Sequence, residues 1–289
     1  MSTLQKEFLM KKSSFLILIF ILVCNSIGYS QNRKQQFELK AKSVTEEIYP
    51  IEVILPVDYD STIRYPIVYI TDWWYYKELN PQIYRRLQVD YVLEPIILVG
   101  IGTIGDGTDL DLERRRDLTP THLTKYDKYD SLKIGSRGIT GGAQNFLSFI
   151  KNELIPVIES QYLSDTLNRG YVGYSYGGLF GTYILSIEPQ LFQKYLLGSP
   201  SMVYDNYLMI ERLKESDPDK LKSVNSIFIT VGEKEGGDQL KGFADLRDLF
   251  LSMKLPSLNL ECIIIGDERH RSSFFPSFIK GIRFLYEEK

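Results

Sequence analysis

The residues from Gly170 to Gly178 combine a short apolar run with a Gly-x-Ser-x-Gly pattern centred on Ser175, and the apolar, helix-compatible segment LFGTYIL follows. A strand, a sharp turn and a helix in this order would expose the Ser175 hydroxyl at the tip of a strained turn. Gly173 and Gly177 leave room for the close backbone approach that such a turn forces. The N–H groups at the start of the helix would face any negative charge that develops beside Ser175. The pattern therefore predicts a nucleophilic serine.

A serine nucleophile needs a base, and the chain has two histidines, His122 and His270. His270 lies in a polar loop that begins where a strand-like run breaks at Gly266, C-terminal to Ser175. A base on a loop after a late strand is the arrangement that such serine sites use. His122 precedes Ser175 in the chain and is out of that order. We therefore predict His270 as the general base.

The third member of such a site is an acid, which we expect between the serine and the histidine. A strand predicted over residues 224–231 runs into a loop that carries Glu233, Glu235 and Asp238. The acid must be held so that it accepts a hydrogen bond from the imidazole and fixes its tautomer. Spacing alone does not choose among the three carboxylates. We favour Glu235, with Asp238 second and Glu233 third.

The rest of the chain alternates between strand-like and helix-like patterns, which implies a mostly parallel central sheet with helices on both faces. Apolar runs predict strands over residues 48–55, 65–70, 95–101, 195–200, 224–231 and 259–266. Apolar spacing of three and four predicts helices over 146–158, which Pro156 kinks or ends, and over 272–286. The stretch 204–222 is expected to be a polar, partly helical insert, and 102–137 to be a long polar loop that is functional or disordered. We expect one α/β domain and no second domain.

Composition limits the function classes. The chain has 289 residues, 44% of them hydrophobic and 25% charged, and a net charge of −3, which are ordinary values for a globular protein. This charge favours no role in nucleic-acid or membrane-surface binding. Two histidines and few cysteines offer no cluster of metal ligands, so we expect neither a metal nor an organic cofactor. Cys262 lies within a predicted strand and is expected to be a core residue that forms no disulfide.

The N-terminus has the pattern of a secretory signal peptide. The basic pair Lys11–Lys12 precedes an apolar run over residues 15–23, and Gly28 and Ser30 are small residues at the −3 and −1 positions of a cleavage site. The apolar run is short for a membrane span. We therefore expect a signal peptide over residues 1–30, a mature domain over 31–289, and a secreted or periplasmic location.

Two details of this segment leave alternatives. Cys24 raises the question of a lipoprotein anchor, but Val23 before it is not the small residue that lipidation prefers. Met10 would make a more usual start than Met1 for a signal peptide of this kind.

Taken together, these residues resemble the esterase-D-like family of α/β-hydrolases, which includes enterobactin and salmochelin esterases, feruloyl esterases, S-formylglutathione hydrolases and mycolyl transferases. The resemblance runs from about Ile48 to Tyr286 and rests on the following motifs: the strand end Val53–Pro56, Tyr69-Ile70-Thr71-Asp72, Glu153-Leu154-Ile155-Pro156 in the 149–162 helix, Gly173-Tyr174-Ser175-Tyr176-Gly177-Gly178, Ser199-Pro200-Ser201, Val231-Gly232-Glu233-Lys234-Glu235 and His270. It implies an α/β-hydrolase fold with Ser175 and His270 as nucleophile and base. It favours Glu235, because the acid of the family lies three residues after the glycine matched by Gly232. A Ser–His dyad, described for some siderophore esterases of the family, is the alternative.

The resemblance also implies an oxyanion hole made of two backbone N–H groups. One donor would be Tyr176, the residue after the nucleophile. The second donor of the family follows an Asp-Gly pair, whereas this chain has Asp72-Trp73. Trp74 N–H is then the matched donor, with Trp73 as the alternative. The missing glycine places bulky rings at the mouth of the expected pocket.

The function that the resemblance implies is that of a carboxylic ester hydrolase acting through an acyl-enzyme, on siderophore esters or on feruloyl or acetyl esters of polysaccharides. The aromatic cluster Trp73–Tyr76, with Trp73 and Tyr75 foremost, could stack on an aromatic or sugar part of the substrate. The arginine run Arg114–Arg116, with Arg116 foremost, could pair with an acidic part. The alternatives are acyl transfer to an alcohol with the same residues and a catalytically inactive hydrolase fold that binds ligands.

Overall fold

The structure is a computed structural model that describes residues 34–45, 47–90, 92–103, 107–125 and 140–287. Apart from Lys34 and Gln35, these residues belong to the compact unit Gln36–Lys289. The predictions of a signal peptide over 1–30, of lipidation at Cys24 and of a start at Met10 lie outside the described residues.

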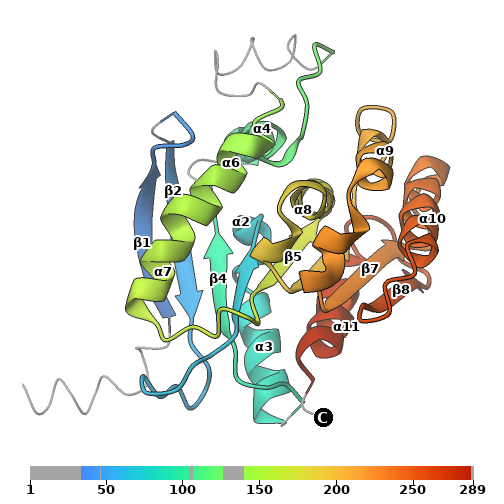
Figure 1. The fold of residues 1–289 in the computed structure, drawn as a ribbon. Coiled ribbons are helices and arrows are strands. Elements are labelled where there is room, and N and C mark those ends of the chain that lie inside the picture. Colours follow the sequence, from blue (N-terminus) through green and yellow to red (C-terminus); the bar gives the residue numbers. More distant parts are fainter. Residues whose placement is uncertain (1–33, 46, 91, 104–106, 126–139, 288–289) are drawn as a thin grey trace, which may run out of the picture. The chain divides into compact units, whose positions relative to one another are not determined.

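The described residues contain a sheet of eight strands in the order β1-β2-β4-β3-β5-β6-β7-β8 (Figure 1). The strand bounds are β1 Lys34–Ala41, β2 Glu47–Ile54, β3 Ile67–Ile70, β4 Ile97–Ile101, β5 Gly170–Tyr174, β6 Lys194–Gly198, β7 Ser226–Gly232 and β8 Asn259–Ile265. Strand β2 runs antiparallel to β4, and every neighbouring pair from β4 to β8 is parallel. The prediction of a mostly parallel sheet is confirmed. Strand β1 was not predicted, because its sequence lacks an apolar run.

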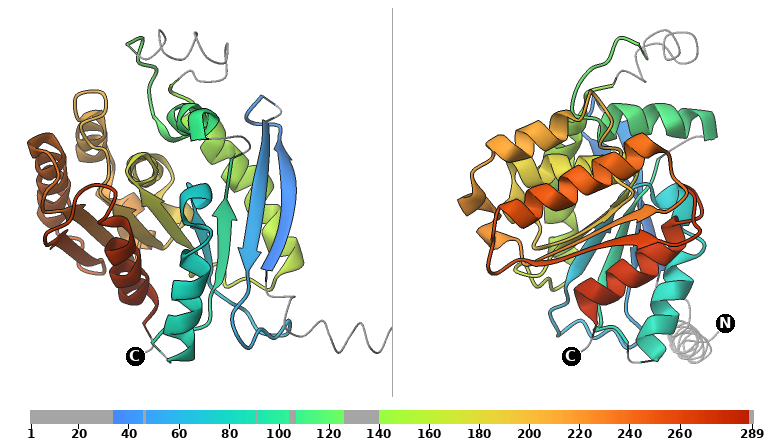
Figure 2. Two further views of the ribbon diagram at one scale, coloured as in Figure 1. Left: turned by 180° about the vertical axis from the view of Figure 1, so that it is seen from behind. Right: turned by 90° about the vertical axis from the view of Figure 1, so that its right-hand side faces the viewer.

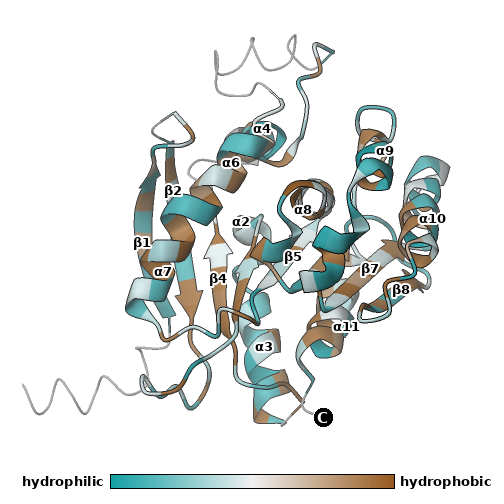
Figure 3. Ribbon diagram, in the orientation of Figure 1, coloured by the Kyte–Doolittle hydropathy of each residue, from teal (hydrophilic) through white to brown (hydrophobic). Residues whose placement is uncertain are grey.

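The central strands are apolar along their whole length because both faces of the sheet are covered. Along β3, Ile67 and Tyr69 belong to one hydrophobic cluster, whereas Val68 and Ile70 belong to another. This alternation follows from the period of two residues of a strand. In Figure 3, hydrophobic residues accordingly dominate β4 and β7, while α3 is largely hydrophilic on the side that faces the viewer.

Helices cover both faces of the sheet. The helix bounds are α2 Trp73–Tyr76, α3 Asn80–Val89, α4 Gly107–Leu118, α6 Ala143–Phe149, α7 Ile155–Gln161, α8 Tyr176–Ile187, α9 Leu208–Glu215, α10 Gly237–Ser252 and α11 Phe274–Tyr286, with a π-helical turn at Ile150–Leu154 and 3₁₀ turns at Pro189–Leu191 and Pro218–Ser223. Helices α6, α7, α8, α9 and α10 pack on the face that includes Tyr69, and α2, α3 and α11 pack on the face that includes Val68 (Figures 1 and 2). Among the described residues, no helix is both long and apolar enough to cross a membrane.

The predicted helix over 146–158 is one part of a longer helical segment from Ala143 to Gln161. The π-helical turn Ile150–Leu154 ends two residues before Pro156, which is the second residue of α7. Proline has no N–H to donate and its ring would clash with the carbonyl of the preceding turn. We attribute the wider π turn to this ring, so Pro156 widens the helix instead of ending it.

The expectation of a polar loop over 102–137 is wrong over part of its length, because helix α4 occupies Gly107–Leu118. This helix is mostly charged and has a low mean hydropathy, which hides it from an apolar pattern. It is held by the burial of Leu110, Leu112 and Leu118 and by ion pairs of its arginines. Residues 126–139 of the expected loop lie outside the described residues.

Cys262 is only half-buried, because β8 is the last strand of the sheet. Its environment still raises the pKa of the Cys262 thiol to about 12, chiefly by burial. The thiol is therefore protonated at neutral pH, as expected for an unreactive cysteine.

Candidate active site

Ser175 lies at the junction of β5 and α8 with φ 58° and ψ −115°, a positive φ that a non-glycine residue rarely adopts. The turn is tight enough to require glycine on either side. A Cβ on Gly173 would run into the carbonyl oxygen of Gly177, and a Cβ on Gly177 would lie 2.6 Å from Thr71 Oγ1. The two glycines of the pattern are therefore explained by close approach of the backbone. The turn exposes the Ser175 side chain to a pocket.

Three predicted side chains form a continuous chain of hydrogen bonds. Ser175 Oγ lies 3.0 Å from His270 Nε2, and His270 Nδ1 lies 2.5 Å from Glu235 Oε2. The three residues follow β5, β8 and β7, and the carboxyl ends of parallel strands meet at one edge of the sheet. Residues more than 30 positions apart in the sequence are brought together in this way.

Glu235 is held on both of its oxygens, and its side chain is 2% exposed. Oε1 accepts the backbone N–H of Gly232 at 2.7 Å, and Oε2 accepts the hydroxyl of Ser199 at 2.6 Å. Burial by itself raises the pKa of Glu235, but the hydrogen bonds from His270, Ser199 and Gly232 outweigh it and lower the pKa below its ordinary value. The carboxylate is therefore ionised at neutral pH and faces the imidazole as an acceptor.

The other candidates contact neither Ser175 nor His270. Glu233 accepts the backbone N–H of Asp267 at 2.7 Å on the surface. Asp238 lies in the first turn of α10. His122 has Thr140 Oγ1 at 3.4 Å from its Nδ1. Of the three competing carboxylates, the structure brings only Glu235 to the imidazole.

Further polar residues surround these three. Ser201 Oγ lies 3.2 Å from Ser175 Oγ. The hydroxyl of the buried Tyr174 donates to the carbonyl of His270 and lies 2.5 Å from Ser273 Oγ. Sequence reasoning assigned no role to these residues, although Ser201 stands in one of the motifs that carried the resemblance.

Gln239 of α10 completes the surroundings of the acid. Its Nε2 donates to the carbonyl of Ser199 at 2.8 Å and to the carbonyl of Pro200 at 2.8 Å. Ser199 itself has φ 38°, so its backbone also needs support. The glutamine therefore holds the turn that presents Ser199 to Glu235. Nothing in its sequence neighbourhood marks it, because the contact spans 40 residues.

The two expected oxyanion donors begin helices. Tyr176 is the first residue of α8, and Trp74 is the second residue of α2. The N–H groups of a first helical turn point along the axis, away from the helix. Asp72 stands before α2 with φ 59°, in the left-handed conformation for which glycine is the usual residue and which aspartate tolerates. The N–H of Tyr75 is taken by the carbonyl of Asp72 at 3.0 Å.

Arg114 of α4 binds Asp72 with two contacts. Its Nε lies 2.5 Å from Oδ1 and its Nη2 lies 3.0 Å from Oδ2, with side-chain exposures of 15% for Arg114 and 1% for Asp72. Burial lowers the pKa of Arg114, but the Asp72 carboxylate raises it by more, so the guanidinium stays charged. It also lies 5.4 and 5.6 Å from the ring centroids of Tyr75 and Tyr176. This ion pair thus joins α4 to the start of α2.

A pocket of about 390 Å³ opens at Ser175 and His270. Its remaining lining is aromatic and charged: Tyr75, Tyr76, Asp111, Arg114, Tyr174, Arg271, Phe274 and Phe275. Among the described residues, no group of three or more His, Cys, Asp or Glu side chains is arranged to hold a metal ion.

Of the residues expected to contact substrate, Tyr75 lines this pocket, whereas Arg116 and Trp73 do not. Arg116 is turned toward Asp117 at 2.7 Å and Glu47 at 3.0 Å, because the helix α4 that carries it points successive side chains in different directions. Trp73 is buried against the sheet and lines a different pocket. The arginine of this run that reaches the Ser175 pocket is Arg114.

Comparison with known proteins shows the family of this chain. The model of the protein family described as "Putative esterase" matches residues 42–242, which is more than half of the chain. The chain belongs to this esterase family. Among solved structures, the BES protein from Bacillus cereus matches with a TM-score of 0.78 at 26% identity, covering 89% of this chain and 97% of that one. The fold is that of an α/β-hydrolase.

Curated relatives include esterases of siderophores. The chain is 30% identical over 160 residues to the ferri-bacillibactin esterase BesA of Bacillus subtilis, covering 54% of each protein. It is 30% identical over 175 residues to a siderophore triacetylfusarinine C esterase of Aspergillus fumigatus, covering 58% of this chain and 56% of that protein. The chain therefore spans about half the length of the curated relatives it matches.

Proposed function

We propose that this protein is a carboxylic ester hydrolase that works through an acyl-enzyme on Ser175. The observation that carries the proposal is the chain of hydrogen bonds from Ser175 through His270 to Glu235, with distances of 3.0 and 2.5 Å. A nucleophile, a base in hydrogen-bond reach of it, and an acid that orients the base are the three parts that serine acyl transfer needs. Membership of the esterase family supports the same reaction.

In the proposed mechanism, Ser175 Oγ attacks the ester carbonyl carbon while His270 Nε2 takes the hydroxyl proton. The tetrahedral intermediate collapses, the bond from the carbonyl carbon to the alcohol oxygen breaks, and His270 returns the proton to the departing alcohol. Water then attacks the acyl group on Ser175, with His270 as base, and releases the acid. Glu235 stays ionised throughout and stabilises the imidazolium, in line with its lowered pKa.

The oxyanion of each tetrahedral intermediate would lie between the N–H groups of Tyr176 and Trp74. These residues lie in the first turns of α8 and α2, whose N–H groups would face the oxyanion. The buried Asp72–Arg114 ion pair lies at the start of α2 and holds it against α4. Donors fixed before the reaction need no rearrangement when charge develops.

For the substrate, we propose the ester bonds of a siderophore. Two observations support this choice. Curated relatives are named as siderophore esterases. The Ser175 pocket combines the rings of Tyr75, Phe274 and Phe275 with the guanidinium groups of Arg114 and Arg271. Aromatic faces and planar cations suit an aromatic, anionic ligand such as an iron-bound catecholate.

The test uses the full chain and its Ser175→Ala and His270→Ala variants on p-nitrophenyl acetate and butyrate, then on ferric and iron-free enterobactin and a feruloyl arabinose ester. We expect turnover by the unmodified protein and a loss of about 10³-fold or more in kcat for each variant. A preference for the enterobactin esters supports the siderophore assignment, and a preference for the feruloyl ester overturns it. If Ser175→Ala retains activity, or if the unmodified protein hydrolyses none of these esters, the proposed catalytic function is wrong and a binding role is favoured.

Acyl transfer is separated from hydrolysis in the same assay. Added ethanol or glycerol competes with water for the acyl group on Ser175. A hydrolase gives the free acid as its main product at every alcohol concentration, whereas a transferase gives mainly the new ester.

We further propose that the chain is exported after cleavage between Ser30 and Gln31. The support is the pattern of a basic pair, an apolar run and small residues before the cleavage site. Intact-mass measurement of protein recovered outside the cytoplasm should give a chain that begins at Gln31. A mass that includes a lipid on Cys24 would replace this proposal with a lipoprotein anchor.

A further inference from the structure

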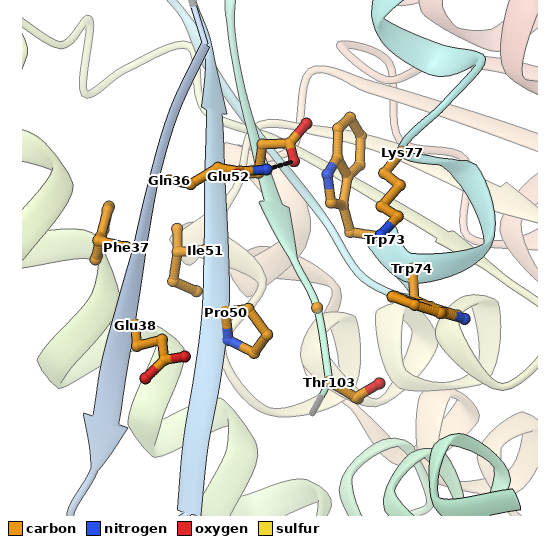
Figure 4. Close-up of a pocket in the computed structure, with 11 residues that line it drawn as sticks. Gln36, Phe37, Glu38, Pro50, Ile51, Glu52, Trp73, Trp74, Lys77 and Thr103 are labelled. Atoms are coloured by element: carbon orange, nitrogen blue, oxygen red, sulfur yellow. Dashed lines mark hydrogen bonds between the residues drawn. The ribbon is translucent and has the colours of Figure 1, made fainter. Parts of the chain in front are cut away.

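A second pocket adjoins helix α2 and strand β2, and we call it the α2–β2 pocket. It has a volume of about 350 Å³, and its lining includes Gln36, Glu52, Trp73, Trp74, Lys77 and Thr103 (Figure 4). This volume is in the range of small-ligand sites, roughly 300–1,000 Å³. Helix α2 contributes to both pockets, but with different residues, because Tyr75 and Tyr76 line the Ser175 pocket. The α2–β2 pocket is therefore a separate recess next to the proposed active site.

The pocket wall contains buried polar atoms. Trp73 is 2% exposed, and its ring lies against Gly100, where no side chain could fit beneath it. Within the described part of the chain, Trp73 Nε1 and Thr103 Oγ1 are buried and have no hydrogen-bond partner. Figure 4 shows the indole nitrogen on the side of the ring that faces Glu52. Buried donors without a partner are rare in folded proteins, so this N–H indicates an acceptor that the described residues do not supply.

Glu52 supplies an acceptor on the same wall. It is 4% exposed, and its Oε2 accepts a hydrogen bond from Gln36 Nε2 at 2.5 Å. The Gln36 side chain is itself exposed, so it covers the carboxylate as a movable polar group. A ligand that displaces the Gln36 amide from Oε2 would reach this oxygen of Glu52 and the Trp73 indole together.

Trp74 supplies a flat apolar surface. It is 42% exposed. The Nζ of Lys77 lies 3.8 Å from the centroid of its ring. The pocket thus offers an indole surface, a buried indole donor, a buried carboxylate acceptor and a nearby ammonium group.

These groups discriminate between ligand charges. A cation would pair with Glu52, but it could only donate, would leave Trp73 Nε1 without an acceptor and would be repelled by Lys77. An anion could accept from Trp73 but would be repelled by Glu52 and by Glu38, which also lines the pocket. A neutral hydroxyl both donates and accepts, so it can pair with Glu52 and Trp73 at once.

We propose that the α2–β2 pocket binds one pyranose ring of a neutral carbohydrate. Its hydroxyls replace the Gln36 amide at Glu52 and accept from Trp73 Nε1, and an apolar face of the ring lies on Trp74. The proposal does not depend on the ester hydrolase activity, because the two pockets share no lining residue. Trp74 would contribute its side chain to the α2–β2 pocket and only its backbone N–H to the proposed oxyanion hole.

The chain offers a direct probe of this site, since its two tryptophans both line the α2–β2 pocket. The experiment titrates the full chain carrying Ser175→Ala with methyl β-D-glucopyranoside, methyl β-D-xylopyranoside, methyl α-D-mannopyranoside and cellobiose, and follows tryptophan fluorescence. We expect a saturable change with at least one of these sugars, at a Kd on the order of 1–10 mM. Ethylammonium and inorganic phosphate should give no saturable change.

The matched variants are Glu52→Gln and Glu38→Gln, which remove a buried and an exposed carboxylate of the same pocket. Glu52→Gln should weaken sugar binding by about tenfold, and Glu38→Gln by less than about twofold. Thr103→Val serves as the second variant if Glu52→Gln does not fold. No saturation with any sugar up to about 100 mM overturns the proposal. Saturation by ethylammonium or phosphate contradicts the proposed class of ligand. Unchanged sugar affinity in Glu52→Gln and Thr103→Val contradicts the proposed location of the site.

Discussion

Two buried carboxylates lie on either side of the proposed nucleophile, and each is hydrogen-bonded to a different kind of side chain. The side chains of Glu235 and Asp72 are 2% and 1% exposed, and each is hydrogen-bonded by a nitrogen base. Glu235 faces the imidazole of His270, whereas Asp72 faces the guanidinium of Arg114. An imidazole can take up and release a proton during a reaction, whereas a guanidinium in a protein remains protonated.

The difference assigns different tasks to the same functional group. Beside a titratable partner, the Glu235 carboxylate can stabilise a charge that appears and disappears during each turnover. Beside a permanent charge, the Asp72 carboxylate can only hold a geometry, here the start of α2. We therefore propose that one side of Ser175 serves proton transfer and that the other side serves position. Variants on the two sides of Ser175 should therefore have different effects on kcat and on stability.

The largest effect is expected at the proton-transfer side. Glu235→Gln keeps the shape of the side chain but removes the charge that stabilises the imidazolium, so kcat should fall by about 10²- to 10⁴-fold. Steady-state hydrolysis of p-nitrophenyl butyrate measures this. The control variants Glu233→Gln and Asp238→Asn should stay within about twofold of the unmodified protein. A Glu235→Gln enzyme within about tenfold would show that a Ser175–His270 dyad suffices.

A smaller effect is expected at the positional side. Arg114→Lys keeps the charge but loses the two-point contact with Asp72, so kcat should fall by about 10- to 100-fold, less than the loss of a whole oxyanion donor. The matched control is Arg116→Lys, because Arg116 is also ion-paired but lies outside the Ser175 pocket. It should lower the melting temperature without lowering kcat. An Arg114→Lys enzyme with a raised KM and unchanged kcat would mean that Arg114 binds substrate and does not position α2.

The pH dependence of stability tests the ionised state of Glu235. The folded pKa of Glu235 lies below its ordinary value of 4.5, so the ionised carboxylate stabilises the fold at any pH above that value. This contribution is lost as the pH falls through the lowered folded pKa. Urea unfolding at a series of pH values should therefore show the unmodified protein more stable than Glu235→Gln near neutrality, with the gap closing in acid. A gap that widens in acid would contradict the assignment.

The smallest effect is expected at Tyr174, which holds the loop of His270. Tyr174→Phe removes a hydroxyl that donates to the carbonyl of His270, so unfolding should become easier by about 1–2 kcal/mol and kcat should fall a few-fold. Tyr195→Phe is the control, because this buried tyrosine donates to Pro189 away from the pocket. It should cost similar stability and leave kcat unchanged. Equal kcat losses in the two variants would show that Tyr174 has no particular effect on the base.

The proton-transfer side was largely predictable from the sequence. Ser175, Glu235 and His270 each follow an apolar strand run, and their order in the chain matches one known arrangement. Because parallel strands end at the same edge of a sheet, local patterns were enough to expect the three side chains together. Their mutual distances are structural observations, and their catalytic roles remain predictions.

The positional side was not predictable, because it depends on contacts between distant segments. The Asp72–Arg114 pair spans 42 residues, and α4 lacks the apolar periodicity that identifies a helix from its sequence. Without that helix, nothing distinguishes Arg114 from Arg116 in a run of three arginines. The helix turns one side chain to the pocket and the other toward Glu47.

The backbone of Ser175 also has a consequence for how the sequence can change. A non-glycine residue at φ 58° and ψ −115° holds about 1–3 kcal/mol of strain that the surrounding fold must outweigh. Glycine would relax this turn, so selection for stability alone favours losing the side chain on which the proposed reaction depends. Replacement of Ser175 by glycine would therefore make the protein more stable and, if the proposal holds, inactive.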